Sequence, residues 1–313
     1  VDTRAFDCAN PVTVTFAPPT LTNNGTLNLE GSAVVTTALT TGAGSLLRVR
    51  GNNVTSSVNA TITNGFTNTA ALELIALDAG YSVQLNVTTG SLTNASTGAI
   101  TTLVGAGGTR TLAAQLDNQG AVLVAYPLTL ARASAAHVNS GSITMSGTAD
   151  LTVTQSGTTP SFTNTGTITL APGQSMAVNG GLLDLQAGLV AGSTSFLTTA
   201  GSPTVRFSSA TVQPRIGFAA GTVLPDPIVI PAGDSLRIYT GVFAPPSLTN
   251  NGTLFLEGNA VVTTAAMVFA QRLAALFHRV AVAQVVPEAA RHFEDAERVA
   301  AFAGRLAAED VQL

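Results

Sequence analysis

A long internal repeat constrains this chain more than any other feature of its sequence. Residues 16–38 read FAPPTLTNNGTLNLEGSAVVTTA and residues 243–265 read FAPPSLTNNGTLFLEGNAVVTTA, so 20 of 23 positions are identical. The two copies are offset by 227 in sequence number, from Phe16 to Phe243, and the chain therefore contains one complete long unit and the beginning of the next. Such repetition indicates tandem duplication and is typical of proteins that stack similar units.

A shorter and looser period runs inside the long unit. Asn-x-Gly triplets followed by alternating apolar residues begin at five asparagines: Asn23, Asn118, Asn139, Asn164 and Asn250. Degenerate relatives begin at Asn68 and Asn94, and the sequence numbers from Asn68 to Asn164 rise in steps of 26, 24, 21 and 25. Because Asn and Gly accept positive φ, these triplets are natural turns. We predict that their asparagine side chains stack in a ladder that satisfies the turn amides.

The segments after these turns predict strands. They carry Thr, Ile, Leu and Val in the period-2 pattern of a pleated surface. Several short strands within each such step are typical of a β-solenoid in which each coil pairs with the next. We therefore predict that residues 1–265 form a right-handed parallel β-helix. A set of β-sandwich repeats is the alternative, because short strands bounded by turns also fit that fold.

Composition divides the chain near Ala266. The whole chain has 13 basic and 17 acidic residues, or 10% charged, against roughly 25% in ordinary soluble proteins. Residues 1–266 hold 19 of these charges and residues 267–313 hold 11, whereas all 45 threonines precede Ala265. Two kinds of polypeptide are joined here. We assign residues 1–265 to the repeat region and residues 266–313 to a separate tail.

The tail has a helical pattern. From Met267 to Val286 its apolar residues follow one another at steps of 4 and 3, as on one face of an amphipathic helix. Pro287 ends this segment and can begin a second helix. We predict a truncated α-helical hairpin that packs through six side chains: Phe269, Leu273, Leu276, Phe277, Val280 and Phe293.

Several functional classes are excluded by simple counts. A net charge of −4 and a pI near 5.3 leave no basic footprint for nucleic acid. The single cysteine, Cys8, permits neither an internal disulfide nor a cysteine-based zinc site, and three scattered histidines hold no metal. No run of 18 apolar residues exists, so we expect no membrane span. We expect no cofactor, and we interpret the chain, which opens with Val1, as a fragment.

Motifs of enzymes are present only in isolation. Gly233-Asp234-Ser235-Leu236 spells the nucleophile block of GDSL hydrolases, yet no histidine follows an aspartate at the required spacing. A polysaccharide lyase or hydrolase needs paired carboxylates. The sequence numbers of Asp117, Asp150 and Asp184 differ by 33 and 34, which are not whole multiples of the coil length. We therefore expect them not to align on one face, and we predict no catalytic residue.

The repeat region resembles a family of surface proteins. With its NNGTLNLEG and FTNTGTITL phrases, the segment 1–265 is similar to the β-helical repeats of bacterial adhesins and autotransporter-like proteins. The resemblance implies a secreted or cell-surface location and a non-enzymatic, structural or adhesive role. It also implies contacts of the repeat region with host or cell surfaces or with polysaccharides.

The tail resembles a different family. LAALFHRVAVAQVVPEA at 273–289 and RVAAFAGRLAAEDVQL at 298–313 are similar to part of the gamma/tau subunit of the bacterial DNA polymerase III clamp loader. The resemblance implies a cytoplasmic protein whose helices pack on other subunits through positions such as Leu276, Phe277 and Val280. The chain contains no lysine, so it lacks the phosphate-binding loop of that family's ATPase. We interpret the chain as a fusion of two genes, genuine or artefactual; the alternative is a truncated gamma/tau remnant that acts in subunit association.

Overall fold

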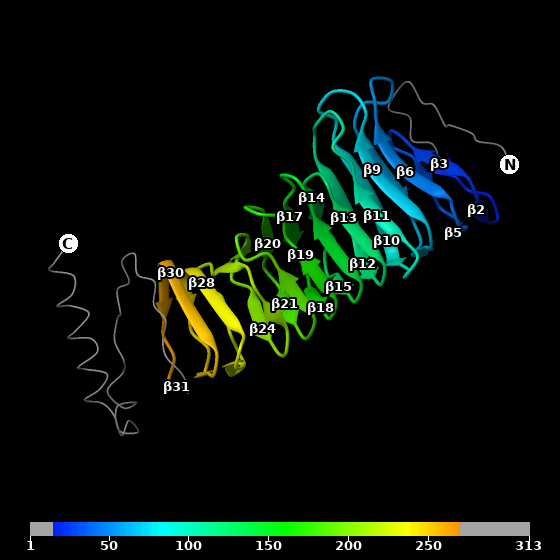
Figure 1. Cartoon of the computed structure of the whole chain (residues 1–313). Coiled ribbons are helices and arrows are strands. Elements are labelled where there is room, and N and C mark those ends of the chain that lie inside the picture. Colours follow the sequence, from blue (N-terminus) through cyan, green and yellow to red (C-terminus); the bar gives the residue numbers. More distant parts are fainter. Residues whose placement is uncertain (1–14, 270–313) are drawn as a thin grey trace, which may run out of the picture.

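The described part of the chain is a stack of β-coils. The computed structural model describes residues 15–269, which contain 31 strands and no helix (Figure 1). Strands of successive coils pair in parallel, and the stack is a parallel β-solenoid of about 12 turns. The solenoid prediction is confirmed. The β-sandwich alternative is wrong, because that fold pairs its strands in antiparallel fashion.

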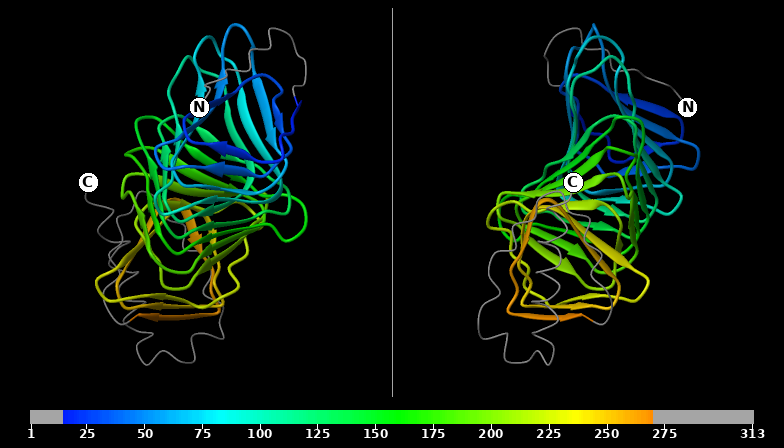
Figure 2. Two further views of the ribbon diagram at one scale, coloured as in Figure 1. Left: turned by 90° about the vertical axis from the view of Figure 1, so that its right-hand side faces the viewer. Right: turned by 60° about the vertical axis from the view of Figure 1, so that its left-hand side comes forward.

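Each coil has three sides, which give the stack a triangular outline when it is viewed closer to its axis (Figure 2). We call these sides face 1, face 2 and face 3 in the order in which the chain meets them. Face 1 consists of β1 (Thr15–Phe16), β4 (Val34–Val35), β7 (Val58–Ile62), the first half of β10 (Val83–Asn94), the first half of β12 (Arg110–Asn118), β14 (Leu128–Leu130), β17 (Leu151–Thr154), β20 (Ser175–Asn179), β23 (Phe196–Ala200), β26 (Arg215–Gly217), and the first halves of β28 (Ser235–Phe243) and β30 (Thr253–Val262).

The other two faces complete each coil. Face 2 consists of β2 (Leu21–Asn23), β5 (Leu39–Thr41), β8 (Phe66–Asn68), β15 (Ala136–Asn139), β18 (Ser161–Asn164), β21 (Leu182–Leu185), β24 (Thr204–Phe207) and the second halves of β10, β12, β28 and β30. Face 3 consists of β3 (Thr26–Leu29), β6 (Leu46–Gly51), β9 (Ala71–Ala76), β11 (Ala99–Thr102), β13 (Ala121–Val124), β16 (Ser142–Met145), β19 (Thr167–Thr169), β22 (Leu189–Ala191), β25 (Thr211–Val212), β27 (Ile228–Ile230), β29 (Ser247–Asn250) and β31 (Ala266–Phe269).

The core consists of rows of identical or similar apolar side chains. On face 3, Leu72, Ile100 and Val122 lie in register on successive coils, and all three are buried. On face 1, Thr111, Thr129 and Thr152 form an outward row in the same way. Because side chains alternate between the two sides of a strand, the period-2 pattern places apolar residues inside and threonines outside. The parallel stacking then repeats this arrangement coil after coil.

The second copy of the 23-residue repeat lies one face further round the coil than the first. Thr26–Leu29 forms β3 on face 3, whereas the equivalent residues Thr253–Leu256 continue face 1 beyond β26 and β28. The local pairing is nevertheless the same in both copies, because Phe16 pairs with Val35 and Phe243 pairs with Val262. The repeat therefore determines how its strands pair with each other, but it does not determine the face of the solenoid on which each strand lies.

The first residues of the predicted helix are in fact a strand. Met267–Phe269, which the apolar spacing assigned to a helix, belongs to β31 (Ala266–Phe269), which pairs in parallel with β29. Without β31, the edge of β29 would present unpaired backbone groups, and the sequence Ala-Met-Val-Phe suits a strand that pairs with them. The strands thus extend to Phe269, past the predicted boundary. The other predicted helix-packing residues lie outside the described part of the chain: Leu273, Leu276, Phe277, Val280 and Phe293.

Candidate functional site

A ladder of asparagines runs along the corner between faces 2 and 3. Its members are all fully buried: Asn68, Asn94, Asn118, Asn139 and Asn164. Each of the first four side-chain amides donates to the Oδ1 of the next asparagine, at 2.6–2.9 Å. Each also donates to a backbone carbonyl, as Asn118 Nδ2 does to Ser142 at 3.0 Å. The ladder pairs polar atoms that burial would otherwise leave unsatisfied.

Three of the five predicted asparagines belong to this ladder: Asn118, Asn139 and Asn164. The other two, Asn23 and Asn250, lie at the two ends of the stack. Asn23 Nδ2 donates to the carbonyl of Leu46 in the next coil at 3.0 Å, and the Oδ1 of Asn250 accepts from the N–H of Gly252 at 3.2 Å. The ladder ends beyond Asn164 because Leu185 occupies the next position in register.

The glycine of the triplet has a different role from the one predicted. Gly120, Gly141 and Gly166 do not adopt a positive φ. A Cβ on Gly141 would instead lie 2.1 Å from the carbonyl oxygen of Gly120 in the preceding coil. Glycine is needed here because neighbouring coils approach closely at the corner, rather than for its backbone freedom.

A cluster of arginines and aromatic rings lies on face 1 near the C-terminal end of the stack. We call it the Arg–aromatic cluster, and its members are Phe196, Arg215, Arg237, Tyr239, Phe255 and Glu257. Glu257 Oε2 lies 2.6 Å from Arg215 Nε in an ion pair, and Glu257 Oε1 accepts from Arg237 Nη1 at 2.9 Å. The guanidinium of Arg237 lies 4.2 Å from the centre of the Phe255 ring. The Tyr239 ring meets Phe196 edge-on at 5.4 Å and is 41% exposed.

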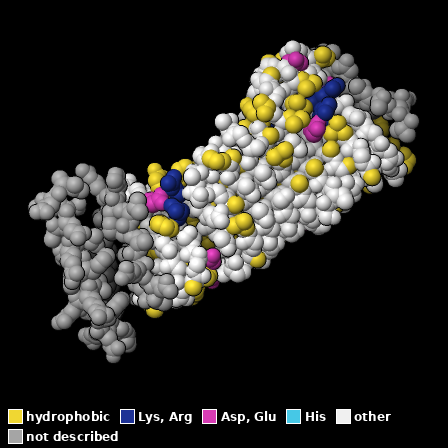
Figure 3. All heavy atoms as spheres, viewed as in Figure 1, with side chains coloured by type: hydrophobic (Ala, Val, Ile, Leu, Met, Phe, Trp, Pro, Cys, Tyr) yellow, Lys and Arg dark blue, Asp and Glu magenta, His cyan; other side chains and the backbone are white. Residues whose placement is uncertain are grey.

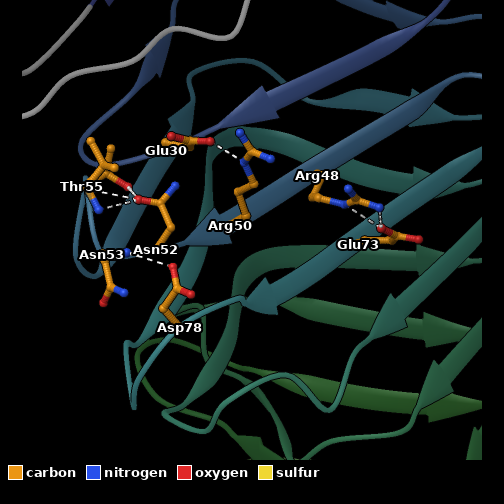
Figure 4. Close-up of polar contacts among 9 residues, drawn as sticks. Glu30, Arg48, Arg50, Asn52, Asn53, Thr55, Glu73 and Asp78 are labelled. Atoms are coloured by element: carbon orange, nitrogen blue, oxygen red, sulfur yellow. Dashed lines mark hydrogen bonds and ion pairs between the residues drawn. The ribbon is translucent and has the colours of Figure 1, made fainter.

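A second charged cluster lies near the N-terminal end, where β6 meets its neighbours. We call it the N-terminal ion-pair cluster (Glu30, Arg48, Arg50 and Glu73). Arg48 Nη2 lies 2.6 Å from Glu73, and Arg50 pairs with the buried Glu30 (Figure 4). Beside it, Asp78 accepts from the N–H of Asn53 at 3.0 Å. In the view of Figure 3, basic side chains gather in two places, one toward each end of the stack.

His137 is a core residue on β15. It is 1% exposed, and its Nδ1 accepts from the N–H of Leu116 at 3.2 Å. Burial, reinforced by the charge of Arg132, lowers the pKa of His137 to about 4. The imidazole is therefore neutral in the folded protein at pH 7, and it takes the place of a backbone acceptor in the strand pairing.

Arg110 is buried without an acidic partner among residues 15–269. Its Nη1 donates to the carbonyl of Gly107 at 2.7 Å, and its guanidinium lies 4.6 Å from the centre of the Tyr126 ring. Burial lowers the pKa of Arg110. Because both terminal nitrogens of its guanidinium donate to carbonyls of the loop before β12, Arg110 closes that loop instead of offering a site for an anion.

The candidate catalytic residues do not assemble. Contrary to the prediction from their spacing, Asp117 and Asp184 do share one outward row of face 2, through Val138 and Thr163. The coils vary in length, so whole multiples of an average coil are a poor guide to register. Three coil steps separate the two carboxylates by about 14 Å, too far for the roughly 5–9.5 Å of a glycosidase pair.

Ser235 lies far from the base that a hydrolase would need. It lines a cavity of about 40 Å³ beside β25 and β27, whereas His137, the sole histidine between residues 15 and 269, lies on β15 in the middle of the stack. Within that same segment no group of three or more His, Cys, Asp or Glu residues could hold a metal ion. Nor does it contain a helix long and apolar enough to cross a membrane.

Sequence reasoning missed the Arg–aromatic cluster. Arg215, Arg237 and Phe255 follow one another at steps of 22 and 18 in sequence number, and each step is one coil. Arginine and aromatic residues that recur one coil apart were the signal in the sequence that could have revealed this cluster.

The fold and these sites define a parallel β-solenoid built from long tandem units. Comparison with protein-family models, curated proteins and solved structures finds no match to this chain.

Proposed function

We propose that this chain is a structural and adhesive rod segment of an exported bacterial surface protein, and that it carries out no reaction. The observation that carries the proposal is the continuity of the stack: on face 1 strands pair without a break from β1 to β30, and the long repeat begins again near the C-terminal end. Coil-to-coil hydrogen bonds and a buried asparagine ladder favour stiffness along the axis. We retain the right-handed sense for the solenoid, since parallel crossovers strongly favour it.

The length of arrays tests the structural part. One complete long unit should lengthen the rod by about 50 Å, since it spans about ten coils at roughly 4.8 Å each. Electron microscopy of chains with one and two complete units measures this increment. A globular particle, or a length that does not grow with the added unit, would contradict the rod.

The Arg–aromatic cluster is the surface we propose for adhesion. Tyr239 exposes a flat ring, and Arg215 and Arg237 offer donors beside it. Aromatic rings bind apolar faces, and arginine recognises carboxylate and sulfate groups with paired donors. An acidic polysaccharide presents both features, so we propose this class of ligand.

Binding to heparin and polygalacturonate tests the adhesive part. Tyr239→Ala should weaken retention on either immobilised polysaccharide about 10-fold, because it removes the exposed ring. Tyr81→Ala is the matched control, since Tyr81 lies at the other end of the stack and donates to Asn53. Equal retention of the two variants, or no retention of the unaltered chain, would remove this surface from the proposal.

The tail supports the alternative role of a gamma/tau-like remnant acting in subunit association. Analytical ultracentrifugation of the chain with and without residues 270–313 tests it, and the cut follows Phe269 so that β31 is kept. Identical mass distributions would remove any assembly role of the tail. Long sequencing reads through codons 250–280 distinguish a genuine fusion from an artefact.

A polysaccharide lyase is the weakest alternative, since no carboxylate pair within residues 15–269 supports it.

A further inference from the structure

We propose that consecutive long units join end to end, each unit docking one face further round the solenoid than the unit before it. The partner of each end is thus a second copy of the unit, residues 16–242. The inference deepens the proposed function and rests on it, because it takes the rod as part of a tandem array.

The path of the chain determines the offset. Eight coil steps lead along face 3 from β3 to β25. The chain then moves one face forward to β26 on face 1, and two more coil steps reach β30. Since Thr26–Leu29 and Thr253–Leu256 are the same position of the repeat, one unit spans ten coils and one face.

The repeat can begin on different faces because its Asn-x-Gly turn fits more than one corner of the coil. Asn23 and Gly25 turn the chain from face 2 to face 3, between β2 and β3. Asn250 and Gly252 turn it from face 3 to face 1, between β29 and β30. Both asparagines accept a hydrogen bond from the glycine two residues later at 3.2 Å. The turn that begins a unit therefore forms at either corner with the same hydrogen bond.

The same glutamate of the repeat is held by arginines from opposite directions at the two ends of the unit. Glu30 and Glu257 are equivalent, yet Glu30 is held by Arg50 from the following coil and Glu257 by Arg215 and Arg237 from preceding coils. Superposing the copies places one carboxylate between the arginines of two successive units. The outward rows of the two units also become continuous. Arg237 pairs in register with Phe255, and Asn28, which is the equivalent of Phe255 in the first copy, pairs in register with Arg48.

A buried amide at the C-terminal end fits the same joint. Asn250 is fully buried, and its Nδ2 has no hydrogen-bond partner within residues 15–269. In the first copy, Asn23 Nδ2 donates to the carbonyl of Leu46, one coil ahead. In a tandem array, residues 243–265 are followed by residues 39–242 of the second unit, so the carbonyl of its Leu46 would reach Asn250 as that of the first unit reaches Asn23. An unpaired buried amide is costly, so this joint is favoured over an open end.

The joint also concentrates charge. It unites Arg215, Arg237 and Glu257 with Arg48, Arg50 and Glu73 of the next unit, four arginines against two glutamates. In Figure 3, basic and acidic side chains lie close together at two places, one toward each end of the stack. A net positive patch would recur about every 50 Å along the array. Such spacing suits multivalent binding of a long acidic polysaccharide.

Spin labels test the register of the joint. The full chain receives a second unit inserted after residue 242, together with Cys8→Ser, Arg237→Cys in the first unit and Arg48→Cys in the second. Two coil steps separate the labelled positions, so we expect a narrow distance distribution below about 20 Å. Arg237→Cys paired with Arg48→Cys of the first unit is the control, and its distance should be about 40 Å across eight coil steps. A broad or long distance for the joint pair would overturn the proposal.

A second measurement avoids the arginine substitutions. In the two-unit chain, Asn23 of the inserted unit takes the place that Asn250 holds in the original chain. Asn23→Ala of the second unit should lower the melting temperature of the two-unit chain more than Asn250→Ala lowers that of the original chain, because only the former removes a hydrogen bond to the Leu46 carbonyl. Equal shifts would count against the joint. Electron microscopy separates the two proposals: a lengthened rod with a long spin-label distance removes the joint alone, whereas the absence of a rod removes the proposed function.

Discussion

Gly25 and Gly252 occupy the same position of the 23-residue repeat but have different surroundings. A Cβ on Gly252 would lie 2.3 Å from the carbonyl oxygen of Pro231 in the preceding coil, whereas a Cβ on Gly25 would meet no atom within 4 Å. Neither glycine has a positive φ. The pair therefore isolates the effect of coil-to-coil approach at one sequence position.

Alanine at these two sites should have opposite effects. Gly252→Ala must push β30 away from Pro231, and we expect a loss of about 1–3 kcal/mol, typical of overpacking. Gly25→Ala should be neutral or stabilise by up to about 1 kcal/mol, because it restricts the unfolded chain. Urea denaturation combined with hydrogen exchange of β29 and β30 measures both. Similar losses for the two variants would show that the turn, and not the neighbouring coil, requires glycine.

The asparagine ladder should tolerate no interruption. Asn139→Ala removes the acceptor of Asn118 and the donor to Asn164, and we expect a loss of about 2–4 kcal/mol from these unsatisfied groups. Asn139→Asp should be worse, because a carboxylate cannot donate to Asn164 and carries a buried charge.

An exposed asparagine pair gives the control for the ladder. Asn86 Nδ2 donates to Asn59 Oδ1 at 2.6 Å on the outer surface, so Asn59→Ala should cost less than about 1 kcal/mol. Thermal melts of the three variants make the comparison. Equal costs at Asn59 and Asn139 would mean that burial of the ladder does not contribute to stability.

The fold was predictable because its signals are local. Asn-x-Gly turns and alternating residues act within one coil, and they indicated parallel coils and a row of asparagines. The register between distant coils was not predictable, because coils differ in length and these differences in length add up from one coil to the next. Asp117 and Asp184 share a row for this reason, and the second copy of the repeat lies on a new face.

Residues that depend on tertiary surroundings were also missed. Arg110 is buried by the loop that closes over it, and nothing in its neighbouring sequence distinguishes it from an exposed arginine. The spacing of Phe269 suggested a helix, but the open edge of β29 overrides a helical preference over the short span of β31.

Strand β31 should stabilise the strand beneath it. A chain that ends at Ala265 lacks β31, whereas a chain that ends at Phe269 keeps it. We expect amide exchange in β29 to be about 10-fold faster in the shorter chain, because the hydrogen bonds across this edge are lost. The shorter chain should also aggregate more readily through its open edge. Identical exchange in the two chains would show that the pairing of β31 adds nothing.

The stability of the solenoid should fall as the pH is lowered from about 6.5 to about 4. Because burial lowers the pKa of His137 from 6.5 to about 4, the unfolded chain binds a proton in this range that the folded chain does not. The unfolded state is therefore favoured progressively as the pH falls through 6.5, and the effect levels off below about 4. The shift corresponds to about 3 kcal/mol. Urea midpoints of the unaltered chain and of His137→Gln, compared at pH 7 and pH 4, measure it; the variant should lose less stability on acidification. Equal losses in both chains would assign the pH dependence to the carboxylates instead.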